Sequence, residues 1–415
     1  MKKNPQTEEQ VVPWGLSIRQ GLRIALMCAF LCFAVRCAWS WHVRNVPLVG
    51  DQIFYAQSAN ALAAGEGYAF KGELTAGKSP GYSFLISLVW RLFGESRIAL
   101  LLVQSLLAAF GCGVTVILAL RVTRKRAVAL LAGLAVAFYL PMAMSDCMVL
   151  SEALFGPLAL ISVLLLDGAF RSGKFWLCVL AGLGTGLAAY VRAEVVVLPL
   201  VFLVVLLCRR VSAARAFACF AVIGVVVFAS LLPWGLRNRS VFGVFTPFPS
   251  SGGLSFAANW NANSRHSSLL IAPYWQSELL NSIKGKNEYE VDRILKQWAV
   301  KEIKADPAQY AKSIVLKSIR QWTNLFNITS PSKATLVLAV VNTVVVAFAI
   351  PALWRRRIDS LFRGYALGCI IYVTALAGLM TSGEPRYAFW VWPLIFIMAA
   401  DSLCRAHGGQ LSNSG

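Results

Sequence analysis

The residues that could carry chemistry are a few acids and cations set in a very apolar chain. Asp51, in Gly50-Asp-Gln-Ile-Phe-Tyr-Ala, stands just beyond the first apolar run. An ionised carboxylate in a cleft at the membrane surface could act as a general base that takes a proton from an acceptor hydroxyl. It could equally be a helix N-cap, because aspartate side chains accept hydrogen bonds from the free N–H groups of a first turn.

Further ionisable residues lie close to the ends of apolar segments. Asp146 follows one such segment and Glu152 opens the next, and Arg192 with Glu194 separates two more. Charges at a membrane edge are functional candidates, since burying them is costly. Arg192 and Glu194 could also simply pair with each other.

Two basic motifs close and open later apolar segments. Arg237-Asn238-Arg239 ends one of them, and Glu384-Pro-Arg386-Tyr387 begins the last. Such arginines could bind a phosphate, but arginines at helix ends also commonly reach lipid headgroups without a further role.

The segment from Gly72 to Ser79 fits the G-x-x-x-x-G-K-[ST] pattern of a phosphate-binding loop. That loop requires a buried strand before it and a helix after it, within a βαβ unit. Here Pro80 follows Ser79 at once and no βαβ unit is predicted, so we reject ATP binding. Lys78 remains available for another role.

The composition restricts the class of protein. The chain of 415 residues is 58% hydrophobic and only 14% charged, whereas soluble domains carry about 25% charged residues. This excludes a soluble globular protein, a disordered chain, a collagen and a coiled coil. The net charge of +20 is spread over many short connections between apolar runs. That distribution is typical of membrane topology and contact with anionic lipids rather than of a nucleic-acid surface.

Apolar runs of about twenty residues predict an all-α polytopic membrane protein with about ten transmembrane helices. We expect these helices near residues 20–41, 97–120, 127–145, 149–167, 175–191, 194–208, 214–233, 335–354, 362–381 and 386–404. The predicted parts are a cytoplasmic tail 1–19, a transmembrane module 20–233 that includes the outer loop 42–96, an extracytoplasmic segment 234–334 with amphipathic helices, transmembrane helices 335–404 and a cytoplasmic tail 405–415.

Basic residues in alternate short connections indicate the cytoplasmic side. They are Arg121, Arg124, Lys125, Arg126, Arg171, Lys174, Arg209, Arg210, Arg215, Arg355, Arg356, Arg357 and Arg363. The pattern predicts that both termini are cytoplasmic and that the segments 42–96 and 234–334 are outside, where catalytic groups should be found. His-Val-Arg-Asn follows the first apolar run in place of a small-residue cleavage site, so we expect a retained anchor.

The two outer segments contain predicted helices of their own. Residues 53–62 and 81–93 are too short for a full crossing, which predicts two helices lying along the membrane surface. Asp306 followed by Pro307 predicts the N-cap and first residue of another helix. One face of that helix carries Ala311, Val315, Ile319 and Trp322.

Disulfide and metal sites are not predicted. Nine of the ten cysteines lie in or beside apolar runs and no C-x-x-C occurs, which favours small core residues. Cys147 alone is expected at an outer loop. His42, His266 and His407 are too scattered in the sequence for a metal cluster.

A series of motifs spans the chain from about residue 50 to 400. In order, they are Asp51-x-x-x-Tyr55, Ala61-Leu62-x-x-Gly65-x-Gly67-Tyr68, Lys78-Ser-Pro80-Gly-Tyr82, Leu92-Phe93-Gly94, Ser151-Glu152-Ala-Leu-Phe155, Val191-Arg192, Pro233-Trp234-x-x-Arg237-Asn238, Asp306-Pro307-x-x-Tyr310 and Arg386-Tyr387. With these motifs in this order, the chain resembles the GT-C polyprenyl-phosphate-sugar glycosyltransferases. The protein mannosyltransferase and lipid A aminoarabinose transferase branch is the most similar.

The resemblance implies a multi-span fold with two surface helices in the first outer loop. It also implies an inverting transfer of a sugar from a polyprenyl-phosphate donor to a hydroxyl of a lipid, glycan or protein, with Asp51 as the base. A phosphate leaving group needs cationic stabilisation rather than a proton donor. Lys78, Arg237 and Arg386 are therefore the phosphate candidates. The remaining candidates for substrate contacts are Tyr55, Asp146, Glu152, Arg192, Asn238 and Tyr387.

One departure from the family pattern bears on metal dependence. Many relatives carry a second acid beside the first-loop aspartate, whereas here the neighbour is Gln52. No D-x-D motif occurs in the outer segments, and hard cations prefer several oxygen ligands. We therefore expect an enzyme that needs neither a metal nor another cofactor.

A multi-span transporter or lipid flippase is the alternative, because ten spans and embedded charges would serve it as well. Transporters tend to show internal repeats and broken helices or charges at the bilayer midplane. We find no internal repeat, and the acids cluster at the predicted outer ends of the spans. The enzyme is the favoured hypothesis, and the resemblance implies a bacterial cytoplasmic membrane.

Overall fold

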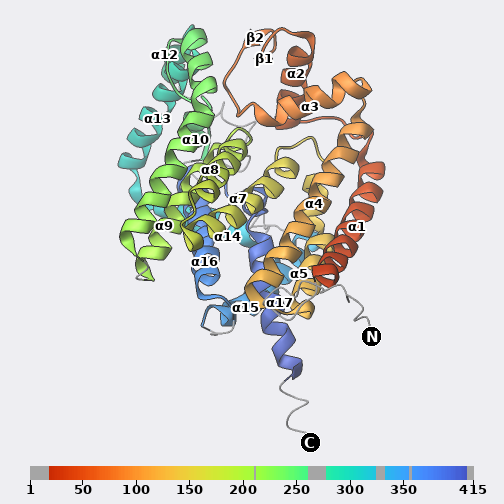
Figure 1. Ribbon diagram of the computed structural model, residues 1–415. Coiled ribbons are helices and arrows are strands. Elements are labelled where there is room, and N and C mark those ends of the chain that lie inside the picture. The colour runs from red at the N-terminus through yellow and green to blue at the C-terminus, as the bar shows by residue number, and fades with distance from the viewer. Residues whose placement is uncertain (1–17, 210–211, 260–276, 324–331, 355–357, 409–415) are drawn as a thin grey trace, which may run out of the picture.

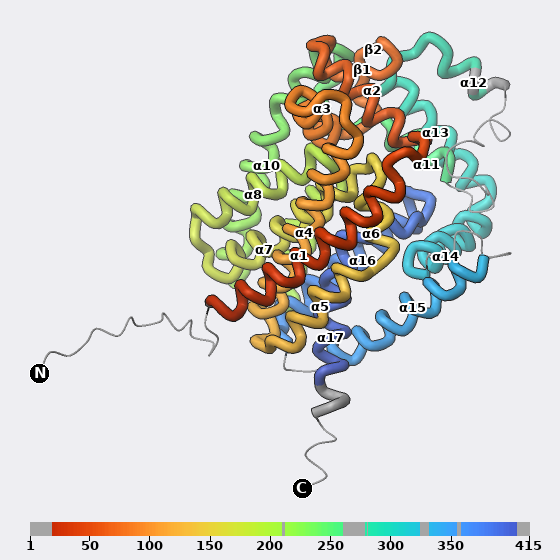
Figure 2. Tube along the Cα trace, turned by 90° about the vertical axis from the view of Figure 1, so that its right-hand side faces the viewer, coloured from red at the N-terminus to blue at the C-terminus, as the bar shows by residue number. Residues whose placement is uncertain are grey.

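The computed structural model describes residues 18–209, 212–259, 277–323, 332–354 and 358–408. They form a bundle in which long apolar helices run between two ends (Figure 1). One end holds the elements of the segment 51–93, and the opposite end holds the first turns of the first helix and the later turns of the last one (Figure 2). The all-α polytopic fold class is confirmed.

A helix forms at each of the ten predicted spans. These elements are α1 (Ile18–Val43), α4 (Arg97–Thr123), α5 (Arg126–Phe138) with α6 (Leu140–Asp146), α7 (Glu152–Ser172), α8 (Phe175–Ala189), η1 (Ala193–Val197) with α9 (Leu198–Cys208), α10 (Ala213–Phe242), α15 (Lys333–Ala349) with η2 (Ile350–Leu353), α16 (Ser360–Met380), and η3 (Pro385–Ala388) followed by α17 (Trp392–Gly408).

Fewer of these helices than predicted are long enough to cross a bilayer. In the part of the chain that the structure describes, six helices have the length and hydropathy of a span, and the bent pair α5–α6 would make a seventh. The other three are shorter apolar helices at Phe175–Ala189, Ala193–Cys208 and Trp392–Cys404. At about 1.5 Å per residue they fall short of the hydrocarbon core of about 30 Å. Hydropathy identifies an apolar run but not the length of the helix that forms inside it. By the criterion of helix length, the predicted count of about ten transmembrane helices is therefore too high.

The third predicted span is bent by 55° at the junction of α5 and α6. Pro141 lacks the N–H that would bond to the carbonyl of Ala137 in a continuous helix. Instead, the guanidinium of Arg36, fully buried on α1, donates to the carbonyls of Ala137 at 2.6 Å and Val136 at 3.1 Å. Its Nε donates to Asp146 Oδ2 at 3.1 Å. A buried cation therefore caps the broken end of α5, and Asp146 neutralises it.

The segment 42–96, which keeps the name first outer segment after its predicted side, contains α2 (Asp51–Ala64), the strands β1 (Ala69–Phe70) and β2 (Glu73–Leu74), and α3 (Gly81–Phe93). A helix forms at each of the two places where a surface helix was predicted, and the position of both along a membrane stays a prediction. The antiparallel hairpin is an addition to the predicted all-α structure. Lys71 and Gly72 have positive φ angles of 55° and 83° at its turn, which is the type I′ geometry that suits a two-residue hairpin loop.

The second outer segment contains α11 (Gly252–Asn259), α12 (Ser277–Ile283), α13 (Glu288–Ala305) and α14 (Pro307–Thr323). As predicted, Asp306 caps α14, because its Oδ1 accepts from the N–H of Gln309 at 2.9 Å. The apolar face of α14 points outward, with Val315 58% exposed, while Lys317 and Gln321 on the other side are buried. This orientation suits a helix whose apolar face contacts lipid.

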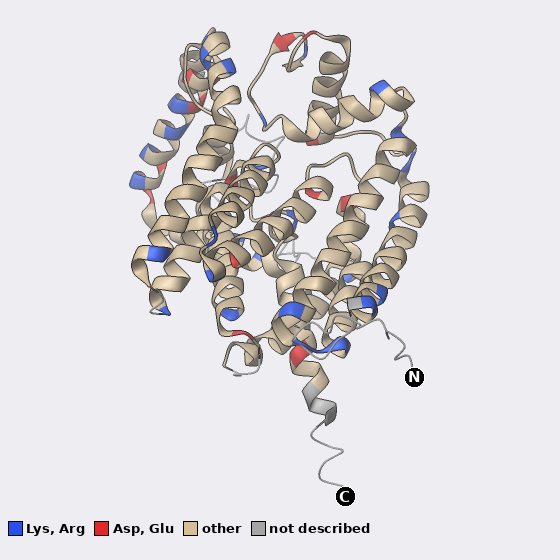
Figure 3. Ribbon diagram, in the orientation of Figure 1, with Lys and Arg blue, Asp and Glu red and all other residues tan. Residues whose placement is uncertain are grey.

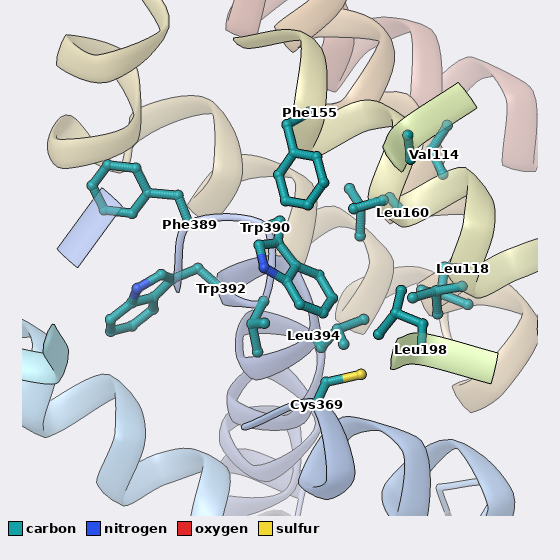
Figure 4. Packing of buried hydrophobic residues seen from close by; sticks show 14 of the residues in the cluster. Val114, Leu118, Phe155, Leu160, Leu198, Cys369, Phe389, Trp390, Trp392 and Leu394 are labelled. Carbon is teal, nitrogen blue, oxygen red and sulfur yellow. The ribbon is translucent and has the colours of Figure 1, made fainter. Parts of the chain in front are cut away.

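Aromatic packing holds the segment that joins α16 to α17. Trp390 and Trp392 are buried, with Trp390 edge-on to Phe155 of α7 at 6.2 Å and Trp392 5.0 Å from the ring of Tyr139. Figure 4 shows Trp390 between Phe155 above it and Leu394 below it. Side chains from early and late helices thereby fix the residues that follow η3.

Lys and Arg lie at the end of the bundle opposite the hairpin, and also along α13 on the left of the view (Figure 3). They include Arg124, Lys125 and Arg126, which join α4 to α5, and Lys174, which joins α7 to α8. Arg210, Arg355 to Arg357 and most of the two predicted tails lie outside the described residues. The bundle therefore has one end with short basic connections and another with α2, α3, the hairpin and α12.

Candidate active site

Asp51 is held by two cations from distant parts of the chain. Its Oδ1 lies 2.9 Å from Nζ of Lys78, and its Oδ2 lies 3.0 Å from Nη2 of Arg386. Asp51 opens α2, Lys78 lies between β2 and α3, and Arg386 lies on η3. The structure thus brings together the predicted base and two of the three predicted phosphate ligands.

These contacts continue into a larger set of ion pairs. Arg386 lies 2.5 Å from Glu384 and 3.8 Å from Glu152, and Arg192 lies 2.9 Å from Glu152 and 3.2 Å from Glu194. The pairing of Arg192 with Glu194 that the sequence allowed is therefore present, and Glu152 shares it. We call this set the Asp51 network; its members are Asp51, Lys78, Glu152, Arg192, Glu194, Glu384 and Arg386. Three cations face four carboxylates, a formal excess of one negative charge.

Helix ends position the acids of the Asp51 network. Asp51 and Glu152 are the first residues of α2 and α7, and Glu194 lies in the first turn of η1. Free N–H groups and the helix dipole favour negative charge at these places. Asp51 is not the N-cap, because Gly50 takes that position with a φ of 53° and no side chain caps the helix. The side chain of Asp51 is therefore free to meet Lys78 and Arg386.

The two cations keep Asp51 ionised. Burial opposes its ionisation, but Lys78 and Arg386 outweigh burial and lower the pKa of Asp51 to about 2. Burial likewise opposes the charge on Lys78, but Tyr55 and Asp51 raise its pKa. At neutral pH the site therefore holds a carboxylate between an ammonium and a guanidinium group.

Aromatic rings line the cations. Lys78 Nζ lies 5.6 Å from the ring centre of Tyr55, and the guanidinium groups of Arg192 and Arg386 lie 4.8 Å and 5.2 Å from that of Tyr387. Such cation–π contacts hold charged side chains in a defined place. The ring of Tyr387 thus lies against two guanidinium groups of the Asp51 network.

A close backbone approach positions the loop that carries Lys78. The N–H of Gly81, at the start of α3, donates to the carbonyl of Tyr190 at 2.7 Å. A Cβ on Gly81 would lie 2.7 Å from that same oxygen, closer than van der Waals contact allows. Tyr190 precedes Arg192 by two residues. Only glycine therefore lets this loop pack against the segment that carries Arg192.

Gly81→Ala should destabilise the protein and lower its activity. Overpacking against an atom that cannot move aside costs about 1–3 kcal/mol, and Lys78 would shift with the loop. Differential scanning fluorimetry in detergent measures the change in Tm. Gly156→Ala is the matched control, because a Cβ at Gly156 on α7 meets nothing within 4 Å. Equal Tm values for the two variants would contradict the packing argument.

Arg237 and Asn238 lie outside the Asp51 network. Arg237 donates to the carbonyls of Thr75 at 2.8 Å and Tyr68 at 3.1 Å. The side-chain amide of Asn238, fully buried, donates to the carbonyl of Thr246 at 2.7 Å. Both residues brace the hairpin and the start of the second outer segment. Their roles as phosphate and sugar ligands stay predictions, and the geometry gives Arg237 a structural task instead.

Glu288, which the sequence analysis did not identify, ties the two outer segments together. Thr75 Oγ1 donates to its Oε1 at 2.6 Å, and its Oε2 accepts from the N–H of Ala76 at 2.7 Å and from Ser250 Oγ at 2.9 Å. This carboxylate thus holds the chain two residues before Lys78. Acids are common in polar outer segments, and nothing in the sequence distinguishes this one.

Asp146 also has a structural partner, since it forms the buried ion pair with Arg36. The sequence carried a signal for this pair, because a lone arginine inside an apolar span calls for a partner. Cys147, expected at an outer loop, is fully buried and donates to the carbonyl of Arg36 at 3.3 Å. The bend between α5 and α6 draws this segment into the bundle.

The prediction of a metal-independent site stays a prediction. Within the described ranges, no three His, Cys, Asp or Glu side chains are grouped so that they could hold a metal ion. The acids of the Asp51 network instead face Lys and Arg side chains. His266 lies outside these ranges.

Comparisons with known proteins bear on the fold and the family. Residues 77–234 match the family model described as dolichyl-phosphate-mannose-protein mannosyltransferase. No curated protein sequence matches the chain. The oligosaccharyltransferase AglB from Archaeoglobus fulgidus, in complex with an inhibitory peptide and a dolichol-phosphate, is similar with a TM-score of 0.59 and 14% identity, over 93% of this chain and 50% of that chain. The apo form of the Archaeoglobus fulgidus oligosaccharyltransferase has a TM-score of 0.59 and 15% identity, over 95% and 52%.

ArnT from Cupriavidus metallidurans, bound to undecaprenyl phosphate, matches with a TM-score of only 0.39 and 16% identity, over 94% of this chain and 78% of that chain. A TM-score this low does not show a shared fold. The shared fold is shown by the archaeal structures, whose TM-scores are 0.59. This chain spans about half of the length of the archaeal structures. The family model covers residues 77–234 alone, and a likeness at 14–15% identity shows a shared fold.

Proposed function

We propose that this chain is an integral-membrane, inverting glycosyltransferase. It moves a sugar from a polyprenyl-phosphate donor to a hydroxyl acceptor on the extracytoplasmic face. The observation that carries the proposal is the position of Asp51 between Lys78 and Arg386. One carboxylate and two cations are the groups that this reaction needs, and they converge from three separate segments. The dolichol-phosphate bound to the structurally similar archaeal enzyme supports a lipid-linked donor.

The chemistry follows from these charges. Asp51 takes the proton of the acceptor hydroxyl while the acceptor oxygen attacks the anomeric carbon of the sugar. The bond from that carbon to the phosphate oxygen breaks, and its electron pair stays on the phosphate. Lys78 and Arg386 stabilise the charge that develops there. Glu152 Oε2 is buried and has no hydrogen-bond partner among the described residues. It can therefore accept a hydrogen bond from a hydroxyl of the sugar or the acceptor.

We propose that the reaction needs no metal ion, because the carboxylates that could bind one are already paired. Each acid of the Asp51 network already faces an arginine or a lysine. Those cations supply the positive charge that a divalent ion would otherwise bring to the phosphate. Full turnover by EDTA-treated protein is the expected result, and loss of turnover that is restored by added Mg²⁺ or Mn²⁺ would contradict it.

Release of polyprenyl phosphate tests the proposed function directly. Purified protein in detergent should release it when donor and acceptor are both present, with Asp51→Asn as the inactive control. Intact-lipid mass spectrometry of copurified lipid would identify the donor to use. A transporter or flippase would move the lipid but leave the bond between sugar and phosphate intact.

The proposed location is the bacterial cytoplasmic membrane, with both termini cytoplasmic and the Asp51 network outside. A cysteine at Lys304, exposed on α13, should then react with an impermeant maleimide in intact cells, whereas one at Ser360, exposed at the start of α16, should not. Cys208 is exposed and should first be changed to serine. Labelling at Ser360 without labelling at Lys304 would place the Asp51 network on the cytoplasmic side.

A further inference from the structure

The two cations assigned to the donor phosphate are already occupied by the base. We propose that the carboxylate of Asp51 sits where the donor phosphate binds, and that donor binding exchanges carboxylate for phosphate on Lys78 and Arg386. This inference rests on the proposed function and deepens it. It makes Asp51 a competitor of the donor in the free enzyme and a base only in the donor complex.

The geometry suits such an exchange. Each oxygen of Asp51 meets one cation, at 2.9 Å for Lys78 and 3.0 Å for Arg386, so the carboxylate spans the two as a pair of phosphate oxygens would. Guanidinium and ammonium groups bind phosphate with the same donors that they offer a carboxylate. The side chains are 35%, 26% and 22% exposed for Asp51, Lys78 and Arg386. An arriving ligand can therefore reach them.

The surroundings allow Asp51 to leave while the cations stay. Arg386 uses Nε for Glu384, and its Nη1 faces Glu152, so these acids hold the guanidinium while Nη2 changes partner. Lys78 pairs with no second carboxylate within the described ranges. Its ammonium group instead lies over the rings of Phe54 and Tyr55. Only the short side chain of Asp51 has to turn away.

The charges of the Asp51 network and the donor show at which step the exchange helps the reaction. The Asp51 network carries an excess of one negative charge, and the donor phosphodiester adds another. During transfer the acceptor proton moves to Asp51 and removes one negative charge, while the leaving phosphate gains one. Because donor binding has already moved the two cations to the phosphate, they face it at the step in which its charge doubles. The total charge of the site and substrates is conserved.

The exchange also removes a difficulty with the base. A carboxylate whose pKa is about 2 accepts a proton poorly, and the ordinary value for aspartate is about 3.9. Once Lys78 and Arg386 turn to the phosphate, the attraction that lowered the pKa weakens and the pKa rises. Arg386 and Lys78 are the cations that face Asp51. The other ionisable groups near them are Tyr55, Tyr387, Glu152 and Glu384.

Binding of undecaprenyl phosphate, which undergoes no transfer, tests the exchange. Asp51→Asn and Asp51→Ala should bind it about tenfold more tightly than the wild type, because the competing charge is gone. The matched control is Glu73→Gln, which changes the charge by the same amount on the exposed strand β2 and should bind like the wild type. Both Asp51 variants should elute as monodisperse protein before affinity is measured by microscale thermophoresis.

The outcomes separate this inference from the proposed function. Lys78→Gln and Arg386→Gln should each weaken binding at least tenfold. If they do and the Asp51 variants bind like Glu73→Gln or more weakly, Asp51 does not compete for the cations and the exchange is wrong, while the phosphate site survives. If the Lys78 and Arg386 variants bind like the wild type, the phosphate assignment itself is wrong, and the exchange falls with it.

Discussion

Asp51→Asn should lower turnover by about a hundredfold or more, the usual contribution of a general base. Asparagine keeps the shape of the side chain but cannot accept the acceptor proton. The assay measures polyprenyl phosphate released per unit time by purified variant and wild type at equal concentration. Tm and donor binding should be measured on the same samples, because the loss must not arise from unfolding or from weaker binding.

A capping role for Asp51 would give a different result. Asparagine caps helices as well as aspartate does, so a cap alone would leave the variant close to wild-type activity. The structure already assigns the cap position to Gly50. Near-normal turnover would remove Asp51 from the mechanism and direct attention to Glu152, another acid that lies near Arg386.

Arg386→Ala should lower turnover by about a hundredfold, the usual cost of removing one group that stabilises developing negative charge. Turnover should fall more than donor affinity, because the leaving phosphate carries more charge than the bound donor. Arg386→Lys should be partly active, since an ammonium group restores the charge but cannot meet Asp51, Glu384 and Glu152 at once. Separate measurement of turnover and donor binding for both variants gives the comparison.

Arg239→Ala is the matched control for this prediction. Arg239 is an exposed arginine near the end of α10 and belongs to no ion pair described above. It should show the effect of losing a headgroup contact alone, which is a change in expression or stability. If Arg386→Lys and Arg386→Ala have equal activity and both resemble Arg239→Ala, Arg386 contacts lipid rather than substrate.

Local sequence signals predicted the elements well. The second surface helix was expected at residues 81–93 and occupies Gly81–Phe93, because Pro80 precedes it and Gly94 follows its apolar run. Asp306 and Pro307 likewise marked the start of α14. The hairpin at 69–74 has only two residues in each strand, too few for an alternating pattern. The lengths of α8, α9 and α17 depend on packing, which hydropathy does not record.

The members of the site were easier to predict than their partners. Asp51, Lys78 and Arg386 were each singled out, since charges in an apolar chain are conspicuous, but the ion pairs join residues up to 335 positions apart. Arg237 and Arg386 look alike in sequence, as arginines beside helix ends. Only the tertiary structure shows that Arg237 donates hydrogen bonds to carbonyls beside the hairpin, whereas Arg386 forms an ion pair with Asp51.

The contact of Glu288 with Thr75, Ala76 and Ser250 has a consequence for protein engineering. Because one carboxylate fastens both outer segments, neither segment is an exchangeable module by itself. A chimera that takes only the region 234–334 from a relative without an acid at the position of Glu288 would lose the anchor of the loop that carries Lys78. Such a chimera would lose turnover whatever its acceptor preference. Altering acceptor choice by recombination therefore requires that residues 69–78 and 250–288 be transplanted as one unit.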